Sequence, residues 1–114
     1  MRTLFSIVIA TGVILLVYPV TTTISAELAP IPSGTIVCGG HAYTVDPDPE
    51  GTNIRTAPDK NSPVLRVITH DPEGTSVILA GSFKDWILIQ SAEGVTSEFR
   101  FQGKGWIHAS LLAV

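Results

Sequence analysis

GTNIRTAPDKNSPVL, residues 51–65, is the stretch that decides the fold. A short segment centred on an apolar residue, Asn53 to Arg55, runs directly into a stretch rich in Pro, Asp, Asn and Ser. These residue types favour turns, and the chain becomes apolar again only at Val64. The stretch therefore predicts a brief strand, a long loop over residues 56–63 and a second strand.

Short apolar segments separated by turn signals continue to the end of the chain. They are rich in β-branched and aromatic residues, and they occur at 35–45, 64–69, 75–81, 86–90, 99–101 and 106–108. No stretch after residue 34 keeps a helical apolar period over three turns. We therefore expect an all-β domain, a small sandwich or barrel of about five to seven short strands, and closure would remove the free sheet edges. Gly39-Gly40 fits either a tight hairpin turn or a bulge.

Alternation along the segments predicts which residues form the core. Side chains two positions apart lie on the same face of a strand. The predicted core residues are Ile54, Val64, Ile68, Val77, Leu79, Ile87, Ile89 and Ile107. By the same rule Trp86 and Leu88 point to the opposite face, near the surface.

The first 26 residues differ from the rest of the chain. Arg2 is the only charge before Glu27, Leu4 to Val20 is almost wholly apolar, and Ile24-Ser25-Ala26 would suit cleavage after Ala26. This order is typical of a secretory signal, and the run is also long enough for an uncleaved helical membrane anchor. We expect residues 1–26 to be a signal peptide or N-terminal anchor, 27–35 a linker, and 36–114 the folded domain. The domain would be exported, periplasmic or extracellular, or anchored in the cytoplasmic membrane.

Charge and cysteine content narrow the classes of partner. Residues 1–26 contain one of the seven basic residues and none of the ten acidic ones, so the remainder has a net charge of −4 with His neutral. No basic stripe is visible, which argues against nucleic acid as a partner. Cys38 is the only cysteine, so no internal disulfide forms, and a small apolar residue in a strand is its simpler interpretation.

The order of motifs resembles that of the bacterial SH3-like (SH3b) domain family. The matching segments are NIRTAPDKNSPVL, GTSVILAG, WILI and GKGWIHASLL, and together they cover about residues 41–114. The resemblance implies a small SH3-like barrel in which the 56–63 loop helps to wall a ligand groove. The chain departs from the family pattern at Ala57, Arg66 and Leu111, where Gly, Gly and an aromatic residue are common. These departures leave the expected fold unchanged, but they affect the identity of the ligand that the family resemblance would imply.

Two clusters of residues are candidates for a metal or catalytic site. Asp46, Asp48, Glu50 and Gly51 match the first positions of a calcium-binding EF-hand loop, but Ala57 occupies the position of the bidentate glutamate, so an acidic turn is the better interpretation. Cys38 and His41 could pair as nucleophile and base, or as metal ligands, but a flexible Gly39-Gly40 separates them. We expect no catalytic residue, no metal and no cofactor.

The candidate ligand-binding residues are Tyr43, Asn53, Arg55, Trp86, Leu88 and Trp106. Aromatic anchors dominate small interfaces, and Trp86 with Leu88 would present such a surface, whereas Trp106 precedes the closing turn and also fits a structural role. Asn53 and Arg55 either line the groove or tie down the long loop. The groove would lie between the 56–63 loop, the 91–104 hairpin and the aromatic face.

The function expected from the resemblance is that of a non-catalytic binding module of the cell envelope. It would recognise peptidoglycan peptides or an envelope protein. One alternative is a membrane-anchored adaptor that modulates a separate envelope enzyme. Another is a small metal-linked or hydrolytic protein that uses Cys38, His41 and the acidic turn at residues 46–51. The sequence alone chooses neither the ligand nor the oligomeric state.

Overall fold

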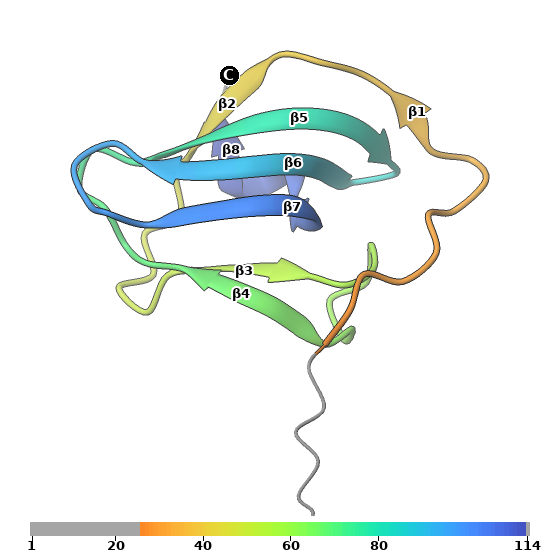
Figure 1. Cartoon of the computed structure of the whole chain (residues 1–114), viewed down its shortest axis with the longest axis horizontal. Coiled ribbons are helices and arrows are strands. Elements are labelled where there is room, and N and C mark those ends of the chain that lie inside the picture. The colour runs from red at the N-terminus through yellow and green to blue at the C-terminus, as the bar shows by residue number, and fades with distance from the viewer. Residues whose placement is uncertain (1–25, 114) are drawn as a thin grey trace, which may run out of the picture.

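The computed structural model describes residues 26–113, which form one curled, antiparallel β-sheet (Figure 1). Its elements are β1 (Ile36–Val37), β2 (His41–Thr44), β3 (Thr52–Arg55), β4 (Val64–Ile68), β5 (Thr75–Phe83), β6 (Trp86–Gly94), β7 (Arg100–His108), the 3-10 turn η3 (Ala109–Leu111) and β8 (Leu112–Ala113). The all-β expectation is confirmed. The hydrophobic helix expected within residues 1–26 lies in a region that, except for Ala26, falls outside the described residues. Within 26–113 no helix is long and apolar enough to cross a membrane.

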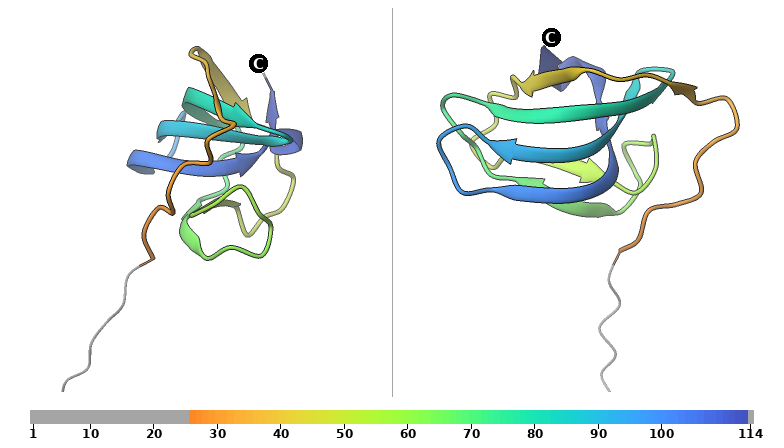
Figure 2. Two further views of the ribbon diagram at one scale, coloured as in Figure 1. Left: turned by 90° about the vertical axis from the view of Figure 1, so that its right-hand side faces the viewer. Right: turned by 45° about the horizontal axis from the view of Figure 1, so that its top comes forward.

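The sheet forms half a barrel rather than a closed one. Its strand order is β4-β3-β7-β6-β5-β2-β8, with β1 paired to β5, and β4 and β8 at the two ends do not pair with each other. Figure 2 shows the curl that brings β3 and β4 across from β5 and β6. The closed barrel expected from the edge argument is therefore wrong for residues 26–113. Two very short strands, β1 and β8, raise the number of strands to eight.

Gly39-Gly40 separates β1 from β2, which pair with the same neighbour, and makes no hairpin between them. β1 and β2 both pair antiparallel with β5, through Val37↔Gly81 and His41↔Ile78. Gly40 has φ +105°, a backbone conformation that residues with a Cβ rarely adopt. Of the two interpretations left open by the sequence, the bulge is confirmed.

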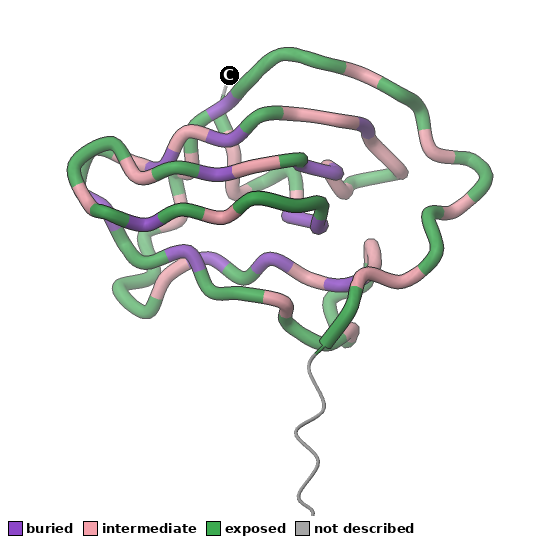
Figure 3. The backbone as a smooth tube through the Cα atoms, in the orientation of Figure 1, coloured by how far each residue is buried: buried purple, intermediate pink, exposed green. Residues whose placement is uncertain are grey.

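The core lies inside the curl of the sheet, where Figure 3 shows the buried positions recurring along the strands. Its buried members are Ala42, Ile54, Ile68, Val77, Ile89, Ala92, Phe99 and Ile107. Five of these, from β3 to β7, were predicted by alternation. Leu79 and Ile87 were also predicted, and they pack against the cluster from partly buried positions.

Val64 was predicted to be in the core, and this prediction is wrong because β4 contains a bulge. Ile54 pairs with Arg66 while Arg55 pairs with Val64, so Leu65 is an extra residue on β4. An extra residue reverses the alternation beyond it. Leu65 therefore packs against the core, and Val64 remains 36% exposed.

Two residues outside the core cluster are also buried, which alternation did not predict. Leu88 was expected near the surface but is only 4% exposed, and Trp106, its partner across β6 and β7, is 0% exposed. Neither belongs to the core cluster. Residues 29–38, which we call the crossing segment, pass beside the outer face of the sheet and line a hollow together with Leu88.

Backbone hydrogen bonds hold both ends of the crossing segment. The Ala29 N–H donates to the carbonyl of Thr56 at 3.0 Å, and the Cys38 N–H donates to the carbonyl of Ala80 at 3.2 Å. The segment thus joins the end of β3 to the middle of β5, on the right of Figure 1. Residues 27–35, expected to be a linker, include part of this attached segment.

A buried carboxylate ties two turns together at the opposite end of the sheet. Asp71 is 6% exposed and accepts hydrogen bonds from the Thr96 hydroxyl at 2.6 Å and from the N–H groups of Glu73, Thr96 and Ser97. Chiefly through the Thr96 hydroxyl, these bonds hold the pKa of Asp71 well below its ordinary value, against the opposing effect of burial. The 70–74 turn and the 95–99 loop are fixed to each other in this way.

Candidate ligand-binding groove

A groove of about 220 Å³ lies where β3, the start of β6 and the end of β7 come together. It is lined by Asp46, Asp48, Gly51, Asn53, Arg55, Lys60, Trp86, His108 and Leu111. Three of the six predicted ligand-binding residues, Asn53, Arg55 and Trp86, therefore line one groove. Strand pairing explains why, since Arg55 pairs with Trp106 on β7 and Trp86 pairs with His108 on the same strand.

The aromatic wall of the groove is a pair of rings from neighbouring strands. Trp86 and His108 are edge-to-face, with centroids 5.1 Å apart and an interplanar angle of 83°. Edge-to-face contact places the positive rim of one ring against the negative face of the other, which fixes both rings. Trp86 is partly exposed, so its indole is available to a ligand.

His108 also holds the turn that follows it. It is the N-cap residue of η3, and its Nδ1 accepts a hydrogen bond from the Ser110 N–H at 3.2 Å. A neutral ring that accepts at Nδ1 carries its proton on Nε2. The same turn brings Leu111 to the groove. One histidine thus orients the tryptophan and positions the apolar residue beside it.

Arg55 anchors the long loop, which is one of the two roles weighed for it. Its Nη1 donates to the carbonyl of Ser62 at 2.8 Å. The Ser62 hydroxyl in turn bonds to the carbonyls of Ala57 at 3.0 Å and Asp59 at 2.7 Å. The loop is therefore held by its own side chains, and Arg55 still lines the groove.

The acidic turn, residues 46–51, forms the other wall of the groove. Its aspartate carboxylates accept hydrogen bonds from groups within and next to the turn. Asp46 accepts from the Asp48 N–H at 3.0 Å and from the Thr52 hydroxyl at 3.1 Å, and Asp48 accepts from the Glu50 N–H at 2.9 Å. These are the bonds of aspartate-led turns. No group of three potential metal ligands occurs within residues 26–113. The groove contains carboxylates on one side and the cations of Arg55 and Lys60 on another.

The other three predicted ligand-binding residues lie elsewhere. Tyr43 is 42% exposed and lines a separate hollow beside the 70–74 turn. Leu88 lines the hollow beside the crossing segment. Trp106 is fully buried, and its indole N–H has no hydrogen-bond partner within the described part of the chain. The structure therefore does not bring Tyr43, Leu88 and Trp106 into the groove that Asn53, Arg55 and Trp86 line.

The 91–104 hairpin was expected to form one wall of the groove, but none of its residues lines the groove. Glu93 pairs with Arg100 at one end of the β6–β7 ladder, whereas Trp86 pairs with His108 at the other. The tip of the hairpin therefore lies away from the groove, and the acidic turn takes the place expected for it.

Cys38 and His41 have separate surroundings. Cys38 lines the hollow beside the crossing segment, whereas the His41 ring packs edge-on against Tyr43 at 5.6 Å between centroids. No thiol–imidazole contact is among the interactions of residues 26–113.

Six residues that line the groove were not among the predicted ligand-binding residues: Asp46, Asp48, Gly51, Lys60, His108 and Leu111. His108 was interpreted as the end of a strand, and only the β6–β7 register reveals that it faces Trp86. Lys60 lies within the 56–63 loop, which was expected to wall the groove, so this position in the sequence could have identified it as a groove residue.

Comparison of the chain with protein-family models, with curated proteins and with solved structures finds no match. The function must therefore be argued from the groove itself.

Proposed function

We propose that this chain is an exported, non-catalytic binding module of the cell envelope with an SH3-like barrel fold. Its groove beside Trp86 recognises a peptide of the cell wall. The carrying observation is that Asn53, Arg55 and Trp86, selected from the sequence, line a single groove of about 220 Å³. The half-barrel sheet and the 56–63 loop that lies beside the groove are consistent with the family that the motifs resemble.

The chemistry of the groove supports a peptide bearing both signs of charge. Asp48 can attract an ammonium group, Lys60 a carboxylate, and the exposed face of Trp86 can pack against the aliphatic part between them. Cell-wall stem peptides carry both kinds of group on short aliphatic side chains. A large aromatic residue among a few well-placed polar groups is typical of small recognition sites.

The test is sedimentation of the fragment 26–114 with insoluble peptidoglycan. This fragment contains all the described contacts of the fold. We expect the wild-type fragment to co-sediment, and Trp86→Ala to weaken retention by at least tenfold, since loss of a central aromatic anchor costs about 2 kcal/mol or more. Tyr43→Ala is the matched variant, because Tyr43 is an exposed aromatic residue that lines a different hollow.

Cooperative melting of each variant shows that the fold is intact. Equal loss by Trp86→Ala and Tyr43→Ala would remove the groove as the site. No retention of the folded wild type would contradict a cell-wall ligand. It would leave a protein partner in the envelope, with the chain acting as an adaptor, to be sought by crosslinking.

A further inference from the structure

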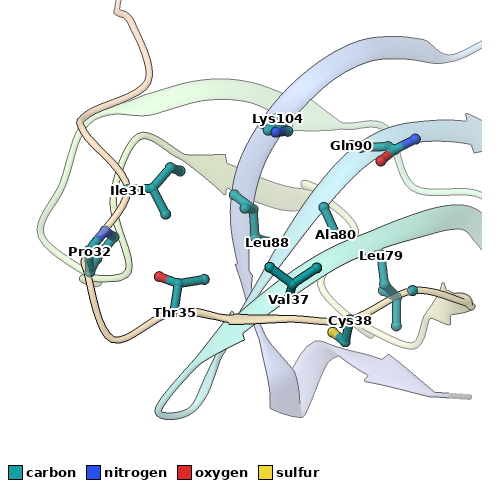
Figure 4. Close-up of a pocket in the computed structure, with 11 residues that line it drawn as sticks. Ile31, Pro32, Thr35, Val37, Cys38, Leu79, Ala80, Leu88, Gln90 and Lys104 are labelled. Atoms are coloured by element: carbon teal, nitrogen blue, oxygen red, sulfur yellow. The ribbon is translucent and has the colours of Figure 1, made fainter.

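A second hollow, of about 760 Å³, lies between the crossing segment and the outer face of the sheet (Figure 4). Ile31, Pro32, Thr35, Val37, Cys38 and Gly39 line it on one side, and Leu79, Ala80, Leu88, Gln90 and Lys104 on the other. Its volume falls within the range of small-molecule sites, which is about 300–1,000 Å³. None of its residues belongs to the groove beside Trp86.

Two apolar side chains of the crossing segment line this hollow and remain exposed to solvent. Val37 is 88% exposed, more than any other large apolar residue in the described part, and Ile31 is 40% exposed. Opposite them lies the aliphatic side chain of Leu88 (Figure 4). Apolar surface left in water is unfavourable, so a ligand that covers Val37 and Ile31 gains from their burial.

The only charge in the lining of this hollow is positive. Lys104 is its only charged residue, in a chain whose net charge is −3. The ion pair found within residues 26–113 joins Arg100 to Glu93, so no carboxylate of that range pairs with Lys104. Lys104 and Gln90 lie on the sheet side of the hollow, across from the crossing segment (Figure 4). An unpaired ammonium beside an apolar hollow favours an anionic head group.

From this arrangement we propose that the hollow binds a single-chain anionic amphiphile, a long-chain fatty carboxylate. The alkyl chain lies between the crossing segment and β5–β6, against Val37 and Leu88, and the carboxylate meets Lys104. An alkyl chain brings no polar groups into the hollow. A peptide backbone would bring N–H and C=O groups, and the exposed polar side chains that line the hollow are Gln90 and Lys104, since the Thr35 hydroxyl is buried. The Cys38 N–H is already bonded to Ala80.

The experiment is a fluorescence titration of the delipidated fragment 26–114 with cis-parinaric acid, an eighteen-carbon fluorescent carboxylate, and with its methyl ester. The ester keeps the chain and loses the charge. We expect saturable binding of one acid per chain and weaker binding of the ester. Lys104→Gln should lower the affinity for the acid about tenfold, as expected for a hydrogen bond to a charged group, and leave the ester unchanged.

Two pairs of variants distinguish this site from surface adsorption. Val37→Asn should weaken both ligands, whereas Val95→Asn, at a 50% exposed valine of the β6–β7 loop, should weaken neither. Lys84→Gln serves as the control for Lys104→Gln, because Lys84 lies in the β5–β6 turn and does not line the hollow. Trp86→Ala should also bind the acid normally, so this proposal and the proposed groove function can fail separately.

Three results would overturn the proposal. They are the absence of saturable binding, equal binding of acid and ester with Lys104→Gln without effect, and equal effects of Val37→Asn and Val95→Asn. Sedimentation of the protein alone is run in parallel. A dimer that Val37→Asn dissociates would show that a second copy of the chain, and not an amphiphile, covers the hollow.

Discussion

Both faces of the β6–β7 ladder contain buried residues, but the two sets have different surroundings. On the inner face, Ile89 and Ile107 are covered by the curl of the sheet itself. On the outer face, Leu88 and Trp106 lie apart from that cluster, and Leu88 shares a hollow with the crossing segment. Alternation within a strand identifies the first face. For Leu88 we expect the burial to depend on the crossing segment, which lies far from it in the sequence and which alternation within a strand cannot report.

The largest effect should come from the inner face. Ile107→Ala removes a fully buried side chain from the centre of the core, and should lower the free energy of unfolding by about 2–5 kcal/mol. Urea unfolding of the variant and of Val95→Ala, an exposed control, measures the difference. A loss below about 1 kcal/mol would mean that the inner face is not closely packed.

The outer face should respond less, because it borders a hollow rather than a filled core. Leu88→Ala is expected to cost about 2 kcal/mol, the lower end for this substitution. The same change made in a fragment that begins at residue 36, without most of the crossing segment, should cost less than half as much. This double-mutant cycle measures how far the segment is responsible for burying Leu88. Equal costs in both fragments would show that it is not.

The stability of the folded protein should depend on Asp71 in a way that acid reveals. Because the pKa of Asp71 is lowered in the folded protein, its contribution to stability is complete above its ordinary value of 3.8 and is lost as the pH falls below that value. Asp71→Asn should melt at a lower temperature than wild type at neutral pH, with a flatter pH dependence in acid. Melting temperatures between pH 2 and 7 test this expectation. Parallel curves for the two proteins would remove Asp71 as the cause.

The smallest effect is expected for Trp106→Phe. The substitution keeps an aromatic ring and removes an indole N–H that has no partner within residues 26–113, so the desolvation cost of that group is also removed. We expect a loss of about 1 kcal/mol, measured by urea unfolding with Trp86 as the remaining fluorophore. A loss above about 3 kcal/mol would indicate that the N–H makes a bond to water or to another group.

The strands and core residues could be predicted where the pattern that identifies them spans only a few neighbouring residues. Turn residues and alternation act over a few positions, so the short strands and the core residues Ile54, Val77 and Ile107 were predictable. A single extra residue, Leu65, reversed the alternation and moved Val64 to the surface.

Some of the groove residues could be predicted from the sequence, and the others depend on how distant strands pair. Asn53, Arg55 and Trp86 carried a local signal, whereas His108 became a groove residue only through the register of β6 with β7. Leu88 and Tyr43 were assigned to the same surface because no local pattern reports which hollow a side chain reaches.

The position of β7 has a consequence for how the chain folds. β3 and β4 form one hairpin and β5 and β6 another, and each can form from contacts close in sequence. Among the strands, β7 joins them, through Arg55↔Trp106 on one side and the long β6 ladder on the other. The β6–β7 pairing is local, but Arg55 and Trp106 lie far apart in sequence. Such a contact slows folding, because a large loop must close before it forms. The two hairpins can therefore collapse early, but the sheet becomes a single cooperative unit only when β7 inserts between them.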